Sequence, residues 1–309
     1  MATIRDIARL AGVSKSTVSN VLNGNVGTYS EETRRKVVAA MRALNYRPNA
    51  VARSLASNQT STVGVLLSDI GREPYARALQ VIEGILSRRG YNIVIANTFN
   101  DPLREERAVE NLLERRIDGL LFVSFSGAGP NDHLVELAES TFPLVVINRA
   151  VPKGLMDSVH IDNSRGVAEA VSHLARRGHR NVGCIHLPLE GPKKTVAGTE
   201  RMAGFRQGME QASLPLRLEW IREAQPGEVN GLRSGFLAAT ELLSRHPKIT
   251  ALVCANDYIA IGAIRAAWRL GRRVPVDLAV VGHDHTVAGR YHVPSVSTVA
   301  QPMTEAATV

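Results

Sequence analysis

Polar side chains near the N-terminus recur at a spacing that would place them together on one side of a helix. Residues 14–22, SKSTVSNVL, fit a single short helix. At about 100° per residue, three polar side chains fall on one side of this helix, namely Lys15, Ser16 and Asn20. The aliphatic side chains fall on the other side, namely Val18, Val21 and Leu22. The helix is therefore expected to bury one edge and to present the other.

The presented side chains suit two kinds of contact with a duplex. A lysine can donate to guanine edges, and an asparagine can pair bidentately with adenine. Short hydroxyl side chains are better suited to phosphate oxygens. We expect Lys15, Ser16 and Asn20 to face bases, and three hydroxyl residues to contact phosphates, namely Ser14, Thr17 and Ser19. The simpler alternative is an ordinary solvated surface helix.

No motif of a common catalytic class occurs in the chain. It has no GxGxxG, GxxxxGK[ST], GxSxG or HExxH pattern. No local motif suggests a Ser/His/Asp or Cys/His group, although a triad assembled in space needs none. His186, His283 and His285 lack metal-ligand spacing to cysteines or acids, so we interpret them as turn or core residues. We expect no catalytic residue, no metal and no cofactor.

Three short helices are predicted over residues 1–47 to position the DNA-facing side chains. Thr3, Ser14 and Ser30 have the type and placement of N-cap residues. Gly12 lies in a tight break between the first two helices. Two helices joined by so short a turn, the second beginning with small polar residues, are typical of a helix-turn-helix.

The charge distribution indicates a polyanionic partner for the same segment. Of the net charge of +8, residues 1–60 carry +6, with nine Lys or Arg against three acids. The remaining chain is nearly neutral, and phosphate contacts dominate nucleic-acid affinity. The 44% of hydrophobic residues indicates a globular chain. Two cysteines within apolar runs, and the lack of a signal core or a long apolar stretch, predict a cytoplasmic protein with no membrane segment.

From residue 62 onward, apolar strand patterns alternate with helical patterns. Strands are predicted at 63–67, 93–96, 119–123, 144–147, 159–161, 182–187, 220–222, 251–255 and 278–282. Helices are predicted at 74–89, 102–116, 131–140, 163–177, 197–212, 229–245 and 257–270. Strands buried on both faces and separated by helices predict doubly wound parallel sheets. We expect an α/β core over 62–309, in two lobes at about 62–155 and 156–300, with a hinge at 48–61.

The N-terminal residues carry a specific resemblance. The segments TIRDIARLAGVSKSTVSNVLNG and NYRPNAVARSLAS closely resemble the headpiece and hinge of the LacI/GalR family, the lactose- and purine-repressor family. In that family a hinge helix forms on the operator and a leucine opens the central base step, a wedge that bends the duplex. The resemblance implies this role for Leu55, with Asn49 and Ala56 beside it. Position 20, often Arg in the family, is Asn here, so the half-site is expected to differ.

The resemblance continues through residues 62–303 and implies a periplasmic-binding-protein-like core. The blocks ERMAGFRQGM, CANDYIAIGAIRA and VVGHDH are similar to family blocks. They imply that Arg201, Asn256 and Asp284 line an effector cleft, where guanidinium, amide and carboxylate groups would hold a polar ligand. Ser68 and Tyr75 are further candidates. A sugar or sugar derivative is the expected effector class.

Two departures from the family pattern affect the core. Relatives often place an aromatic residue near Asn230 and another at the position of His283, and this chain has neither. Relatives also continue for some 25–40 residues beyond the QPM segment that ends at Met303, adding a helix and a strand. From this we expect a shortened or variant C-terminus with exposed apolar surface.

The resemblance implies a sequence-specific transcriptional regulator, most simply a repressor. The expected partners are double-stranded operator DNA, a small sugar-like effector and a second copy of the chain, with no membrane. The expected location is the cytoplasm, associated with the nucleoid. The rival interpretations are a periplasmic-type sugar receptor and a sugar-processing enzyme on the same scaffold. Whether the effector releases DNA or promotes its binding stays open.

Overall fold

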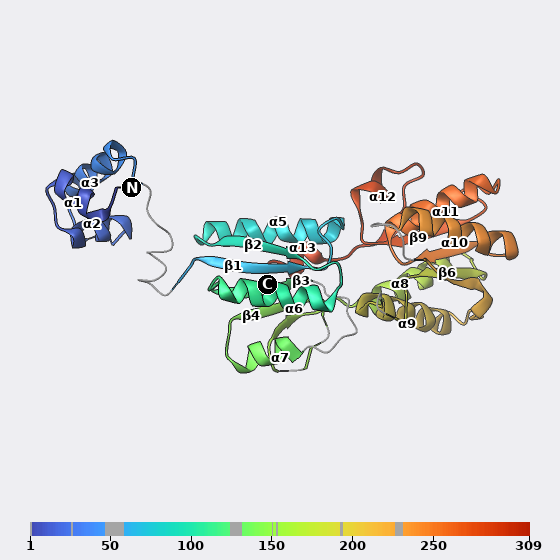
Figure 1. Cartoon of the computed structure of the whole chain (residues 1–309). Coiled ribbons are helices and arrows are strands. Elements are labelled where there is room, and N and C mark those ends of the chain that lie inside the picture. Colours follow the sequence, from blue (N-terminus) through green and yellow to red (C-terminus); the bar gives the residue numbers. More distant parts are fainter. Residues whose placement is uncertain are drawn as a thin grey trace. The chain divides into compact units, whose positions relative to one another are not determined.

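The computed structural model describes residues 2–25, 27–46, 59–123, 132–149, 151–152, 154–191, 194–225 and 231–309. The chain divides into two compact units, Met1–Thr60 and Ser61–Val309. Figure 1 draws both units in colours that follow the sequence. The predicted hinge residues Asn49, Leu55 and Ala56 lie outside the described residues.

The N-terminal unit contains three helices, α1 (Ile4–Ala11), α2 (Lys15–Leu22) and α3 (Glu31–Ala43). Each is capped at its start, since the side chains of Thr3, Ser14 and Ser30 accept from backbone N–H groups of the first turn. Gly12 adopts φ +67° after α1, a left-handed conformation that glycine takes without strain and that turns the chain into α2. The buried side chains of the unit come from all three helices: Ile7, Ala8, Val18, Val37 and Ala40.

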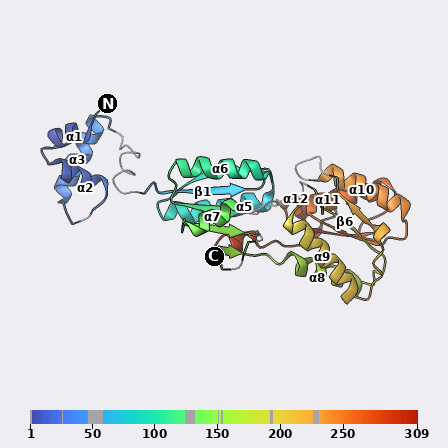
Figure 2. The ribbon, with the colours of Figure 1, turned by 60° about the horizontal axis from the view of Figure 1, so that its bottom comes forward.

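The first sheet of the larger unit is parallel, with the strand order β2-β1-β3-β4-β5. Its strands are β1 (Thr62–Leu67), β2 (Asn92–Asn97), β3 (Gly119–Val123), β4 (Leu144–Ile147) and β5 (Asp157–Val159). Its helices are α5 (Glu73–Arg88), α6 (Pro102–Glu114), α7 (Asp132–Glu139) and α13 (Met303–Ala306). Val65 and Leu67 pack with α5 and α13, whereas Leu66 packs with α6 and α7. Figures 1 and 2 both show α5 and α6 on opposite sides of β1.

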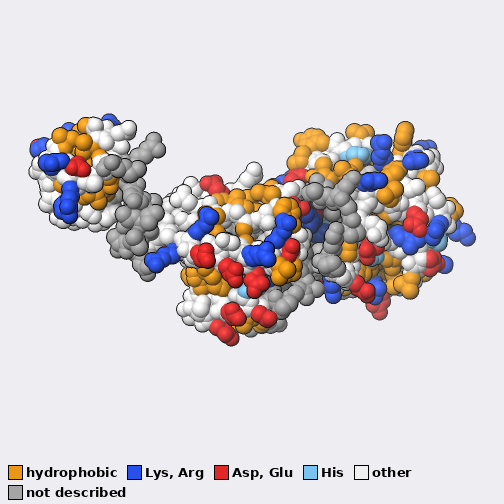
Figure 3. Space-filling model, viewed as in Figure 1, with side chains coloured by type: hydrophobic (Ala, Val, Ile, Leu, Met, Phe, Trp, Pro, Cys, Tyr) orange, Lys and Arg blue, Asp and Glu red, His pale blue; other side chains and the backbone are white. Residues whose placement is uncertain are grey.

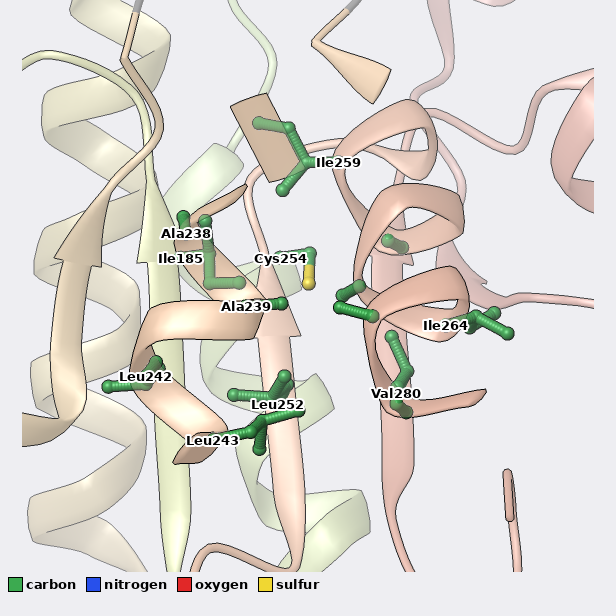
Figure 4. Packing of buried hydrophobic residues seen from close by; sticks show 14 of the residues in the cluster. Ile185, Ala238, Ala239, Leu242, Leu243, Leu252, Cys254, Ile259, Ile264 and Val280 are labelled. Carbon is green, nitrogen blue, oxygen red and sulfur yellow. The ribbon is translucent and has the colours of Figure 1, made fainter. Parts of the chain in front are cut away.

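The second sheet is also parallel, with the strand order β10-β9-β8-β6-β7. Its strands are β6 (Val182–His186), β7 (Ile221–Glu223), β8 (Ala251–Cys254), β9 (Ala279–His283) and β10 (Ser297–Val299). Its helices are α8 (Asn163–Arg176), α9 (Val196–Gln211), the 3-10 turn η1 (Leu218–Trp220), α10 (Leu232–Arg245), α11 (Asp257–Arg269) and α12 (Val287–Tyr291). α8 and α9 supply the core of one face, and α10 and α11 supply that of the other. Figure 4 shows the core under α10 and α11, where Ala239 and Leu243 of α10 lie beside Leu252 of β8.

The two cysteines lie in neighbouring strands but in different cores. β6 pairs with β8 so that Cys184 faces Val253 and Ile185 faces Cys254. Because side chains alternate along a strand, the two sulfurs project to opposite faces of the sheet. Both thiols are buried and free, and burial raises the pKa of Cys184 to about 12.

The α/β fold with a helix-turn-helix and two parallel-sheet lobes is confirmed, and one strand assignment is corrected. The strand predicted at 159–161, as the first of the second series, is β5 at Asp157–Val159, and it pairs with β4 in the first sheet. The chain then enters the second lobe at α8 and returns after β10, so that α13 packs against α5. β10, α12 and α13 have no counterpart among the predicted elements.

Candidate DNA interface and ligand site

The start of α2 presents the predicted DNA-facing side chains. Lys15 and Ser16 are exposed, whereas Val18 is fully buried on the opposite edge. The Ser14 hydroxyl accepts from the Thr17 backbone N–H at 3.1 Å and lies 2.7 Å from the Ser16 hydroxyl. Figure 3 shows Lys and Arg side chains standing out from the surface of this unit.

At the end of α2, the polar side chains of Ser19 and Asn20 accept hydrogen bonds from the residues that follow the helix. Asn20 is half-buried, and its Oδ1 accepts from the Asn25 side-chain amide at 3.2 Å. The Ser19 hydroxyl accepts from the Asn23 amide at 3.5 Å. These contacts orient Asn20 before any duplex is bound, with its acceptor oxygen already engaged.

Arg201 and Asp284, far apart in sequence, meet at the carboxyl ends of the second sheet's strands. Arg201 Nη2 donates to Asp284 Oδ1 at 3.1 Å, and both side chains are buried. Arg201 also donates to the Ala255 carbonyl at 2.5 Å and to Asn163 Oδ1 at 3.1 Å. In open parallel sheets this edge is where ligands bind.

Asp284 receives two further donors. Arg72, from the loop before α5 in the first lobe, donates to Oδ2 at 3.3 Å. His283 Nδ1 lies 3.0 Å from Oδ1, and because an ionised carboxylate only accepts, the imidazole is the donor. Asp284 has φ +108°, and its backbone N–H donates to the Val299 carbonyl at 2.9 Å. The carboxylate is therefore fixed by both lobes.

The charges at this site depend on one another. Burial opposes ionisation of Asp284, but Arg201, the His283 hydrogen bond and Arg72 together hold the pKa of its carboxyl below the usual range. Burial, with the nearby Arg201 charge, lowers the pKa of His283 to about 4, so the ring is neutral at pH 7. Burial raises the pKa of Asp257, which accepts from the Thr286 N–H at 2.6 Å.

Two of the other predicted ligand residues, Tyr75 and Asn256, contact or adjoin residues that bond to this pair. Tyr75 is buried, with its hydroxyl 3.4 Å from Arg72 Nη1 and its ring 5.1 Å from the guanidinium carbon. Ser68 is buried directly after β1, and its hydroxyl has no hydrogen-bond partner among the described residues. Asn256 caps α11, since its Oδ1 accepts from the Ile259 N–H at 2.8 Å. The Asn256 side chain therefore takes an N-cap role in this structure.

Sequence reasoning did not identify three residues that hold the site together. These are Arg72, Asn163 and Glu73. Asn163 is fully buried, and its amide reaches Asn148 of the first lobe at 3.4 Å and Glu200 at 2.8 Å. Both Glu73 carboxylate oxygens lie 3.0 Å from the Val287 N–H, across the two lobes. A charged or amide residue in the loop after a predicted strand was the available signal for Arg72 and Asn163.

The described residues offer few other functional features. They contain no group of three His, Cys, Asp or Glu side chains placed to hold a metal ion. Nor do any of their helices combine the length and apolar character that crossing a membrane requires.

Two family profiles match the chain. Residues 3–49 match the family described as "Bacterial regulatory proteins, lacI family". Residues 60–306 match "Periplasmic binding proteins and sugar binding domain of LacI family".

Named relatives align over nearly the whole chain. The "HTH-type transcriptional repressor PurR" of Proteus mirabilis is 37% identical over 305 residues, which are 98% of this chain and 86% of the relative. The "Catabolite control protein A" of Priestia megaterium is 36% identical over 301 residues, which are 97% and 88% of the two chains.

Solved structures are similar as well. The lac repressor dimer bound to operator and the anti-inducer ONPF is 29% identical with a TM-score of 0.85, covering 99% of this chain and 89% of that chain. The complex of the transcriptional regulator CelR with cellobiose is 31% identical with a TM-score of 0.70, covering 99% and 90% of the two chains.

Proposed function

The chain belongs to the lacI family of bacterial regulatory proteins, and from this premise we propose how its parts divide the work of regulation. It is a DNA-binding transcriptional repressor with a sugar-binding type of effector domain, and it acts as a dimer on operator DNA. Its relatives are repressors, so the expectation of a non-enzyme is confirmed and the enzyme and receptor alternatives are not favoured.

The helix-turn-helix reads the operator through α2. The observation that supports this proposal is that Lys15 and Ser16 are exposed at the start of a helix whose Val18 edge is buried. Lys15 and Asn20 contact base edges, and Ser16 lies beside them. Phosphates are contacted by Ser14, Thr17 and Ser19. A dimer places two such helices in successive major-groove half-sites.

The hinge and the two lobes link ligand to DNA. Residues 48–61 connect a headpiece at 1–47 to the core, and Leu55, flanked by Asn49 and Ala56, wedges the central base step. A ligand held by Arg201, Asp284, Ser68 and Tyr75, beside Asn256, changes how the lobes meet. The change shifts the population of dimers with an ordered hinge, with a coupling of about 1–3 kcal/mol.

The protein works in the cytoplasm, where the chromosomal operator is accessible, and we place it at the nucleoid. The proposal follows from DNA binding, since a repressor acts only where its operator lies.

Selection of a preferred operator, followed by affinity measurements on its variants, tests the proposed base contacts of α2. Full-length protein is used to enrich a preferred duplex from a randomised pool, and affinities are then compared for single-base variants. Lys15→Ala and Asn20→Ala should each relax preference at one position by about 1–3 kcal/mol per lost bidentate contact. Lys36→Ala, an exposed lysine of α3 that pairs with Glu32, is the matched control for charge and should keep the preference. An equal loss on every duplex would contradict base reading by α2.

A further inference from the structure

The hydrogen-bond acceptors at the ligand site are already in use. Asp284 Oδ1 accepts from Arg201 and His283, and Oδ2 accepts from Arg72. The Asn256 oxygen is taken by the Ile259 N–H. A sugar hydroxyl that needed an acceptor would therefore have to share an oxygen that already accepts from one of these donors.

The neighbouring carboxylates are occupied too. Glu73 accepts from the Val287 N–H and pairs with Arg77. Glu200 accepts from the Asn163 amide at 2.8 Å. Asp69 accepts from the Gly71 N–H at 2.9 Å. Each of these anions already has a donor of its own.

In the described part of the chain, polar atoms without a partner are found at the carboxyl ends of the first sheet's strands, where Asn100 Oδ1 after β2 is one acceptor and the others can donate. The Ser68 hydroxyl and the Asn148 Nδ2 have no partner among the described residues, although the two residues are only 2% and 5% exposed. Ser68 follows β1 and Asn148 follows β4, and only β3 separates these strands, so their ends lie roughly 10 Å apart. Buried donors without acceptors are rare, and a ligand is one way to satisfy them.

Two guanidinium groups share the single Asp284 carboxylate. Arg201 and Arg72 both bond to it, and the Arg72 side chain keeps 20% of its surface exposed. Asn148 is joined to Arg201 through Asn163, and Arg72 is four residues beyond Ser68. The leftover donors and the partly exposed guanidinium therefore all follow strands of the first sheet, at the edge from which Arg72 and Asn148 reach the second lobe.

We propose that the effector is a sugar derivative bearing a carboxylate or phosphate group, bound by Arg72, Ser68 and Asn148. The inference rests on the proposed function, because it names the ligand class of the same site. The acidic group supplies acceptors for Arg72 and a neighbouring donor, and the other oxygens of the sugar supply the acceptor for the remaining one; charge-assisted hydrogen bonds to an anion are the strong ones. The ring hydroxyls of the sugar are then left to bind the other proposed ligand residues, Arg201, Asp284 and Tyr75.

Calorimetric titration of the full-length protein without DNA tests the ligand class. Neutral hexoses and pentoses are each paired with their aldonate, their uronate and their sugar phosphate, and inorganic phosphate is titrated alone. We expect the acid of at least one pair to bind at least about tenfold more tightly than its neutral parent, and to weaken as salt rises. The carboxylate and phosphate arms distinguish the two acidic groups.

Two variants and a control test the residues. Arg72→Gln and Ser68→Ala should each weaken the best acid, Arg72→Gln by about tenfold or more. Arg89→Gln removes the same charge at the opposite, exposed end of α5 and should leave Kd unchanged. Thermal unfolding of each variant in buffer checks that it is folded.

Several results would overturn the proposal. These are a neutral parent that binds as tightly as its acid, no acid that binds at millimolar concentration, or inorganic phosphate as tight as any sugar acid. An Arg72→Gln variant that binds the best acid with an unchanged Kd would also overturn the proposal. Operator preference is measured separately and without ligand, so a protein that reads its operator but ignores acids loses only this inference.

Discussion

At the scale of single residues, a buried charge is held by donors from distant parts of the chain. Arg201 and Asp284 are both foreseeable from their motifs, but their direct ion pair is not, because nothing in the sequence states how α9 meets the end of β9. Arg72 is harder still, since its partner lies in the other lobe. Asn256 has a cap role that its position directly before α11 does foretell.

Removing Arg201 tests how much its ion pair with the buried Asp284 carboxylate contributes to the free energy of unfolding. Arg201→Ala should lower the free energy of unfolding by about 3–5 kcal/mol, because Asp284 stays buried with one partner fewer. Urea unfolding measures the loss. Arg206→Ala, an exposed arginine on the same helix, is the control and should change stability by less than about 0.5 kcal/mol. A similar small effect for Arg201→Ala would show that the pair adds nothing.

His283 should make stability depend on pH below neutrality. Its folded pKa of about 4 lies below the ordinary 6.5, so between these values the unfolded chain binds a proton that the folded one does not. Its contribution is present above pH 6.5 and is lost as pH falls toward 4, up to roughly 3 kcal/mol. His283→Gln should flatten the pH dependence of urea midpoints over this range. An unchanged slope in the variant would contradict the assignment.

At the scale of elements, long apolar patterns were predictable, whereas of the described three-residue edge strands only β7 was predicted in its place. The strands at the sheet centres, such as β3 and β8, are buried on both faces and form continuous apolar runs. β5 and β10 have three residues each, lie at sheet edges and contain polar residues, so the pattern misplaces one and misses the other. α12 and α13, with five and four residues, are too short to show a helical period.

The close contact between α10 and α11 in the second lobe depends on a glycine, which has no side chain. A Cβ added at Gly235 would lie 2.4 Å from the Ile259 carbonyl oxygen, where α10 meets α11. Gly235→Ala should therefore destabilise the fold by about 1–3 kcal/mol, because backbone must shift. In α5 the nearest atom to the same addition at Gly84 is the flexible end of Arg88 at 3.6 Å. Gly84→Ala should be neutral or stabilise by up to about 1 kcal/mol in thermal unfolding; equal losses at both sites would refute the packing argument.

At the scale of the whole molecule, the larger unit keeps an exposed apolar surface that suits a second copy. Trp268, Tyr291 and Val293 are 77%, 75% and 89% exposed. Trp268 and Val293 border a pocket of about 670 Å³ that Arg265 and Arg272 also line. Exposed aromatic and apolar groups beside arginines are the composition found at protein interfaces.

Changing this surface should weaken dimerisation. Trp268→Ala and Val293→Asp should each raise the dimer dissociation constant. For Trp268→Ala the increase should be about 30-fold, because an aromatic interface anchor contributes about 2 kcal/mol. Sedimentation velocity over a concentration series measures the constant. Arg89→Gln serves as an exposed control on the other lobe. If both apolar variants dimerise like the unchanged chain, the interface lies elsewhere.

The return of the chain to its first lobe has a consequence for synthesis on the ribosome. Met303 and Ala306 of α13 are buried against α5, yet they follow the entire second lobe in sequence. A nascent chain that has emerged as far as residue 200 still lacks them, so Tyr75, Ala78 and Ile82 are left partly uncovered until translation is almost finished. Because β10 at Ser297–Val299 also completes the second sheet only at this stage, we expect both lobes to mature late, and chaperones to protect the uncovered face of the first.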